Sequence, residues 1–241
     1  MDIVLPVYNE AGIAGTNLRR VADHAGGWDA RFAWRLVVVD DGSRDGSGAI
    51  LDQLALAAPR LSVIHHERNR GMGAALQTAF AACTADYILV MDIDLSYSLQ
   101  CLDEMLARLD GGDADWVLAS CMLPGGGIEN VPLLRRWSTV AANRLLWLCC
   151  GRRLHTLTCV VRGYRGTTLP RTGVTSSDTT INLELLAYGL RRGLRIEEFP
   201  ALLQWPEGGD RGSRMGWARF YRQVQQTVAW GVRLHKASRR G

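Results

Sequence analysis

The sequence has no apolar run long enough to cross a membrane. Its longest central run covers residues 145–150, whereas a spanning helix needs about 20 apolar residues. Met1 is followed at once by an acidic residue and a strand-like run, so no secretory leader is expected. These absences predict a cytoplasmic protein and leave open a peripheral position at the inner face of the membrane.

The six cysteines form no C-x-x-C pair. The spacing typical of structural zinc sites is therefore missing. Two of them, Cys149 and Cys150, are adjacent, and no ordinary disulfide accommodates that arrangement. We expect most of the cysteines to be small buried thiols in a reducing compartment.

Acidic residues are scarce in the second half of the chain. From Arg135 onward there are 19 Arg or Lys and 6 Asp or Glu, against 9 and 18 before it. The acidic first part suits metal binding, and the basic second part suits phosphate groups or an anionic membrane surface. A solvated basic surface is the plain alternative. We expect no nucleic-acid partner.

The first half of the chain alternates short apolar runs with helical patterns. Because the runs lack polar residues at every second position, they indicate a parallel sheet covered on both faces. Ser43 or Asp45 is expected to cap the second helix. The predicted strands cover 3–7, 36–39, 61–65, 87–91 and 116–120, and the predicted helices 13–25, 47–58, 71–82 and 99–109.

The pattern changes after a Gly-rich segment at 124–127, which predicts a flexible loop. Beyond it we expect strands at 156–161 and 195–203 and helices at 137–148, 181–188 and 217–234. With 241 residues and 47% hydrophobic content, the chain can form one large domain. We predict a single domain, 1–241, with halves 1–120 and 121–241.

Polar clusters follow three of the predicted strands, at 8–10, 40–43 and 92–94. Ligands bind at the carboxyl ends of strands in parallel sheets, so these clusters predict one site. Asp92 and Asp94 can face a common cleft, and their oxygens suit Mg²⁺ or Mn²⁺ shared with substrate phosphates. An ordinary acidic turn is the alternative.

The cluster Asp40-Asp41-Gly42-Ser43 also follows a buried run. A carboxylate at Asp41 can accept hydrogen bonds from a ribose or a base edge, and Gly42 permits close backbone approach. The alternative is a type I turn with a helix cap. The tandem His65-His66 ends the third strand, and we interpret both histidines as structural.

Four motifs occur in order: residues 6–10, 39–43, 69–75 and 91–96. Together they resemble family 2 glycosyltransferases of the GT-A fold, and residues 92–96 resemble dolichyl- and polyprenyl-phosphate mannose synthases. The resemblance implies a Rossmann-like, mostly parallel central sheet with helices on both faces. It also implies a bound Mg²⁺ or Mn²⁺ held by Asp92 and Asp94. By the same resemblance the nucleotide sugar would be bound by Pro6, Tyr8, Glu10, Val39, Asp41, Asp92, Ile93, Asp94 and Ser96.

The resemblance assigns phosphate binding to arginines of the second half: Arg136 (or Arg135), Arg162 and Arg211. With Asp94, Arg136 and Arg211 are the expected catalytic residues. The sequence departs from the family at Cys121, where an Arg is usual, and at Thr156, where an Asp is usual. Both departures fall on the acceptor side of the predicted site.

The implied activity is inverting transfer of a hexose from a GDP- or UDP-sugar to polyprenyl phosphate. A soluble transferase acting on a hydroxyl of a small metabolite or glycan is the alternative, and it would need a general base such as Asp178, His155 or Glu184. A binding protein that has lost catalysis is a third reading, which the intact Asp92 and Asp94 argue against.

The C-terminal helix 217–234 carries aromatic and apolar residues at helical spacing, with arginines between them. This amphipathic pattern suits a helix lying in a membrane interface. Core packing with an exposed basic flank is the other interpretation.

Overall fold

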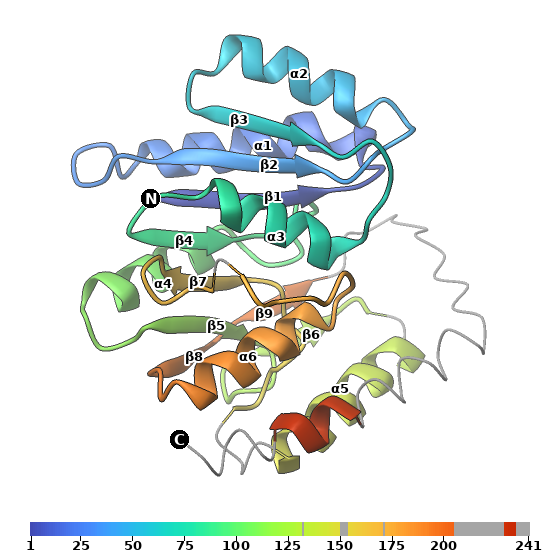
Figure 1. Ribbon diagram of the computed structural model, residues 1–241, viewed down its shortest axis with the longest axis vertical. Coiled ribbons are helices and arrows are strands. Elements are labelled where there is room, and N and C mark those ends of the chain that lie inside the picture. The colour runs from blue at the N-terminus through green and yellow to red at the C-terminus, as the bar shows by residue number, and fades with distance from the viewer. Residues whose placement is uncertain (132, 150–153, 171, 205–228, 235–241) are drawn as a thin grey trace.

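The computed structural model describes residues 1–131, 133–149, 154–170, 172–204 and 229–234 (Figure 1). A seven-stranded sheet with the order β3-β2-β1-β4-β7-β5-β8 forms its centre. The strands are β1 (Asp2–Val7), β2 (Arg35–Asp40), β3 (Leu61–His65), β4 (Tyr87–Val90), β5 (Trp116–Ser120), β7 (Arg162–Arg165) and β8 (Ile196–Pro200).

The sheet is mostly parallel, as predicted. Strands β1 to β4 run in one direction, and β8 is parallel to β5. Only β7 is antiparallel to both of its neighbours, β4 and β5. The carboxyl ends of β1, β2 and β4 therefore meet at one edge of the sheet, on the right in Figure 1.

Helices cover both faces because successive strand residues point to opposite sides. Val37 and Val39 pack in the core on one face, and Leu36 and Val38 in the core on the other. The helices are α1 (Ala11–Gly26), α2 (Ser47–Ala57), α3 (Met72–Ala82), α4 (Gln100–Asp110), α5 (Leu133–Cys149) and α6 (Ile181–Arg191). Residues of α1, α2 and α4 join the second core, and residues of α3, α5 and α6 the first.

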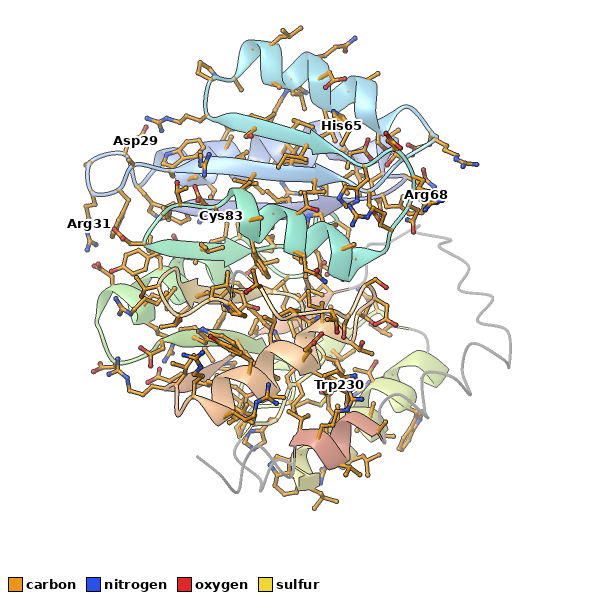
Figure 2. The ribbon with its side chains drawn as sticks, in the orientation of Figure 1. Asp29, Arg31, His65, Arg68, Cys83 and Trp230 are labelled. Carbon is orange, nitrogen blue, oxygen red and sulfur yellow. The ribbon has the colours of Figure 1, made fainter. Side chains whose placement is uncertain are left out.

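The described part of the C-terminal helix packs on α5. Trp230 and Leu234 are buried in the same core as Leu146 of α5, and Figure 2 shows Trp230 on this side of the molecule. Core packing is thus confirmed for residues 229–234, while residues 217–228 of the predicted helix lie outside the described residues. Among the described helices, none has the length and apolar character of a membrane span.

The predicted strand at 156–161 is wrong; the strand in this region is β7, at Arg162–Arg165. Two backbone N–H groups of the predicted segment bind side chains instead of a neighbouring strand. Thr156 N–H donates to Glu198 Oε1 at 2.6 Å, and Leu157 N–H donates to Asn143 Oδ1 at 2.9 Å. These partners are distant in sequence, so an apolar run could not reveal them.

The predicted strand at 195–203 is two strands. It breaks at Ala201, whose N–H donates to Ser120 O and whose carbonyl accepts from Gly127 N–H. The second piece, β9 (Leu202–Gln204), pairs with β6 (Gly127–Glu129). The end of the segment predicted as a flexible loop, 124–127, is therefore the start of a strand.

Ser43 does not cap α2. Its hydroxyl accepts from Asn9 N–H at 2.9 Å. Asp45 is not the cap either, because the N-cap position of α2 is Gly46; the Asp45 Oδ1 accepts from the N–H of Ser47, the first helical residue, at 3.0 Å. Ser43 instead joins the loop after β1 to the loop after β2.

The Asp2 side chain connects the amino ends of three strands, β1, β2 and β4. Its buried carboxylate accepts from Arg35 Nε at 2.6 Å and from the N–H groups of Thr84 and Ala85 at 2.8 and 3.1 Å. Burial alone would raise the pKa of Asp2, but the Arg35 guanidinium and the two backbone donors outweigh it and lower the pKa. The ionised carboxylate thus stabilises the fold.

We expect Asp2→Ala to lower the free energy of unfolding by about 2 kcal/mol at pH 7, the worth of hydrogen bonds to a buried charge. Because the folded-state pKa is depressed, the contribution is full above the unfolded pKa and disappears as pH falls through the folded value. The difference between variant and wild type should therefore shrink below about pH 4. Denaturant unfolding at pH 7 and pH 3 measures it. The control is Asp110→Asn, which removes the exposed ion pair with Arg31 and should change stability little at either pH; equal losses in the two variants would contradict the prediction.

Candidate active site

A cavity of about 320 Å³ opens where the carboxyl ends of β1, β2 and β4 meet. Three of its walls are the segments that follow these strands, and the fourth is the start of α3. Its lining residues are Pro6, Val7, Tyr8, Glu10, Asp41, Asn69, Met72, Ala75, Asp92, Ile93 and Asp94. The polar clusters after the three strands therefore meet in one site, as predicted.

The segment after β4 places Asp92 and Asp94 at the cavity. Its turn is held by Ser96 N–H, which donates to Asp94 Oδ1 at 3.0 Å, and by Asn17 of α1, whose amide donates to Ile93 O at 2.8 Å. Leu95 adopts a φ of 51°, an uncommon value for a non-glycine residue that reverses the chain here. Hydrogen bonds from Ser96 and from Asn17 thus fix the conformation of this turn.

Bringing the two carboxylates together has an electrostatic cost. Burial and, next, the neighbouring Asp94 carboxylate raise the pKa of Asp92 to about 7. A divalent cation would offset both effects. Within the described residues no group of three or more His, Cys, Asp or Glu could hold a metal. Two hard oxygen ligands fit Mg²⁺ or Mn²⁺, which take water and substrate phosphate for the rest of their shell.

Asp41 is buried at another wall of the cavity, with 3% of its surface exposed. Its Oδ1 accepts from Arg70 N–H at 2.9 Å and its Oδ2 from Gly71 N–H at 2.8 Å. Oδ1 also contacts His66 Nδ1 at 2.7 Å. The carboxylate therefore ties the end of β2 to the loop that leads into α3.

Residues 8–10 are held to the loop after β2 by reciprocal hydrogen bonds. Asn9 Oδ1 accepts from Arg44 N–H at 2.8 Å, and Glu10 N–H donates to Ser47 Oγ at 2.8 Å. Asn9 has a φ of 54°, a conformation that Asn tolerates better than most residues. These bonds hold the segment that carries Tyr8 and Glu10, which line the same cavity as Asp41.

Gly42 lets two loops touch. A Cβ at this position would lie 2.3 Å from the backbone of Arg68 and 2.6 Å from Asn69 N, and the φ of Gly42 is +72°. Figure 2 shows Arg68 in the loop between β3 and α3. Because Asn69 lines the cavity, the glycine sets the position of one wall.

Seven of the nine residues predicted to bind the nucleotide sugar line the cavity, and the other two lie behind them. Val39 is fully buried in the core, and Ser96 is buried in the turn after Asp94. The prediction missed Val7, Asn69, Met72 and Ala75. Three of these belong to the motif at 69–75, whose glycines were the available signal.

The two candidate arginines whose side chains are described, Arg136 and Arg162, lie in different environments. Arg136 is exposed on α5 and is not among the residues that line the cavity. The side chain of Arg135 and all of Arg211 lie outside the described residues, so their phosphate roles, like that of Arg136, stay predictions. Arg162 is fully buried, and its guanidinium donates to the carbonyls of residues 157, 159 and 182 at 2.6–2.9 Å. Its predicted phosphate contact is therefore wrong.

The departures at Cys121 and Thr156 place two uncharged side chains in a buried region. Ser120 and Thr156 share a hydroxyl hydrogen bond of 2.7 Å, and Tyr97 hydrogen-bonds with both Cys121 and Cys159. Burial raises the pKa of the Cys121 thiol, and it raises that of Cys159 to about 12. At these two positions the structure has a thiol and a hydroxyl where the resembled family usually has an Arg and an Asp, and the Glu198 carboxylate accepts from Thr156 N–H.

Comparison with known proteins agrees with this geometry. The model of the family described as glycosyl transferase family 2 matches residues 2–169. The chain is 30% identical to polyprenol monophosphomannose synthase of Mycolicibacterium smegmatis, covering 96% of this chain and 86% of the relative. It is 28% identical to undecaprenyl-phosphate mannosyltransferase of Micrococcus luteus, with coverages of 95% and 93%.

A solved structure shares the fold. Glucosyl-3-phosphoglycerate synthase from Mycobacterium tuberculosis, in complex with Mn²⁺, uridine diphosphate and phosphoglyceric acid, superimposes with a TM-score of 0.67 at 17% identity. The match covers 95% of this chain and 78% of that one. The fold is GT-A, as predicted.

The contact at Gly42 can be tested with a matched glycine. Gly46 has a φ of +94°, but a Cβ added there would meet no described atom within 4 Å. Gly46→Ala should therefore cost only the left-handed conformation, about 1–2 kcal/mol of unfolding free energy. Gly42→Ala should cost roughly 1–3 kcal/mol more, as overpacking does, and should weaken nucleotide binding. Thermal unfolding and calorimetric titration with a nucleoside diphosphate measure both effects, and equal behaviour of the two variants would contradict the prediction.

Proposed function

The chain belongs to glycosyl transferase family 2 and is a glycosyltransferase, and we propose that it transfers a hexose from a nucleoside diphosphate sugar to polyprenyl phosphate with inversion at C1. One observation carries the proposal: the Asp92 and Asp94 carboxylates and the buried Asp41 carboxylate line the same cavity. The relatives named above act, by their names, on polyprenyl or undecaprenyl phosphate. Both names also specify mannose, which supports a hexose.

Different walls of the cavity bind different parts of the donor. Asp41, with Tyr8 and Glu10 in the same cavity, recognises the nucleoside through hydrogen bonds to the ribose or base. Asp92 and Asp94 hold Mg²⁺ or Mn²⁺ at the diphosphate end, and the glycosyltransferase of solved structure contains Mn²⁺ and uridine diphosphate. When bound, the metal neutralises charge that develops on the departing diphosphate.

A phosphate acceptor suits this site because it needs no strong base. Its oxygen is already anionic at neutral pH and attacks C1 from the side opposite the diphosphate. The new C1–O bond forms as the bond from C1 to the diphosphate oxygen breaks, and the electron pair leaves with the nucleoside diphosphate. The carboxylates that line the cavity then serve in binding, with no proton to transfer.

A hydroxyl acceptor is the second candidate, and one observation favours it. His155 Nδ1 lies 3.0 Å from Oε2 of the buried Glu198 carboxylate, an arrangement that can orient a histidine as general base. Neither Cys121 nor Thr156 supplies a positive charge that would bind a phosphate, and the Glu198 carboxylate accepts a hydrogen bond from Thr156 N–H. The other two candidate bases have local roles: Glu184 accepts from the backbone of residues 175 and 176, and Asp178 from Thr180.

An exposed apolar face on α5 supports contact with a membrane surface. Trp137, Leu145 and Leu148 are 71%, 40% and 55% exposed and share one side of the helix by their spacing. Arg136 and Arg144 are exposed beside them, and α5 contains no acidic residue. Apolar side chains flanked by arginines match the interface of an anionic bilayer, where a polyprenyl phosphate would reside.

The transfer itself is tested with a radiolabelled donor panel, GDP-mannose and UDP-glucose, with and without a short polyprenyl phosphate. We expect a lipid-soluble product in Mn²⁺ or Mg²⁺ and its loss in EDTA. Asp94→Asn should reduce turnover on the order of 100-fold while the fold persists, since a metal ligand contributes several kcal/mol to the transition state. The control Asp113→Asn changes an exposed carboxylate away from the cavity. Full activity in EDTA would exclude the metal, and transfer only to a hydroxyl would exclude the lipid acceptor.

Membrane contact is tested by co-sedimentation with vesicles that contain anionic lipid. Replacing Trp137, Leu145 and Leu148 together by Ser should abolish binding, and wild-type binding should weaken as salt shortens the screening length below about 10 Å. The control is Leu56→Ser, which changes a 90% exposed leucine on α2. Equal binding by the triple variant and the control would show that α5 is not the contact surface.

A further inference from the structure

The two histidines that end β3 have different partners. His65 is the more exposed: its Nδ1 lies 3.0 Å from Asp40 Oδ2 and its Nε2 3.0 Å from Asp52 Oδ1. Neither aspartate lines the cavity. His66 is buried, with 8% of its surface exposed, and its partner is Asp41.

His66 links Asp41 to α3 through both nitrogens of its ring. Nδ1 lies 2.7 Å from Asp41 Oδ1, and Nε2 lies 2.9 Å from Thr78 Oγ1. An ionised carboxylate can only accept, so Nδ1 carries the hydrogen and donates to Asp41. The ring is fixed at both ends, and it therefore holds the carboxylate in one orientation.

The hydrogen bonds of Asp41 leave a defined acceptor position. Oδ1 receives donors from His66 and Arg70 N–H, whereas Oδ2 receives, among the described residues, Gly71 N–H only. Each carboxylate oxygen can accept about two hydrogen bonds. A ligand in the cavity therefore meets Oδ2 as the available acceptor, provided that His66 keeps the carboxylate from rotating.

We infer that His66 is a positioning residue for nucleoside recognition: it orients Asp41 so that Oδ2 accepts a hydrogen bond from the nucleoside. The inference rests on the proposed function, in which the cavity takes a nucleoside diphosphate sugar. It corrects the interpretation of the histidine pair for His66, and leaves His65 as a structural residue bound to Asp40 and Asp52. Because the carboxylate is already oriented before the ligand binds, no conformational entropy is lost at that step to orient it.

Two amide substitutions separate the two bonds of the ring. In His66→Asn the side-chain nitrogen can occupy the place of Nδ1, so the donor to Asp41 is kept. In His66→Gln the amide reaches the place of Nε2, so the contact with Thr78 is kept and the donor to Asp41 is lost. His65→Gln is the matched control, since it changes the neighbouring histidine and its contacts with Asp40 and Asp52.

The measurement is calorimetric titration of UDP and GDP in the presence of Mn²⁺, with kcat and KM for sugar transfer and the melting temperature of each variant. We expect His66→Gln to weaken binding of the preferred nucleotide about tenfold, the effect of one hydrogen bond to a charged group. KM for the donor should rise in proportion, with little change in kcat. His66→Asn should recover most of the affinity, and His65→Gln should match wild type.

The outcomes distinguish this inference from the function on which it rests. If wild type binds neither nucleotide, the proposed function fails. If wild type binds and His66→Gln binds equally well, or Asn and Gln lose affinity alike in step with their melting temperatures, His66 is only a structural residue. Should His66→Gln fail to fold, Thr78→Val takes its place: it frees one end of the ring and should weaken binding while Asp41 and His66 remain, and unchanged affinity would overturn the inference.

Discussion

The buried carboxylate of Asp41 is the interaction on which the site depends. It collects donors from the end of β3 and from the loop that enters α3, and its own strand supplies another wall of the cavity. An anion at this depth is tolerated only when donors surround it. These hydrogen bonds therefore hold both ends of the loop from residue 66 to residue 71, and the absence of a side chain at Gly42 allows the backbones to meet there.

The wall that carries Asp92 and Asp94 is electrostatically unfavourable instead. Asp92 and Asp94 repel each other, and the turn that holds them is fixed by backbone and amide contacts. The cavity thus combines a carboxylate surrounded by donors with two carboxylates that raise each other's energy. A bound cation would reduce the repulsion between the two carboxylates. Cation binding would therefore also stabilise the folded protein.

The first half of the fold was predictable because its signals are local. Buried parallel strands appear as unbroken apolar runs, and polar residues follow three of them, so β1 to β5 and the place of the site could be predicted. The individual residues of the cavity came from the resemblance to the family. The second half depends on contacts between distant residues. Glu198 and Asn143 accept hydrogen bonds from the backbone N–H groups of residues 156 and 157. No sequence pattern within residues 156 and 157 predicts these bonds. Arg162 shows the same limit: a cation suggests a phosphate partner, but three carbonyls surround this one.

The short ribbon of β6 and β9 contributes to the position of the site. Gln204 N–H donates to Ser96 O at 2.8 Å, and Tyr97 forms a bridge with Leu203. The turn that carries Asp94 and β9 are therefore joined by backbone hydrogen bonds. Because β9 also pairs with β6, residues of the second half of the chain help to hold the segment that places Asp92 and Asp94 at the cavity.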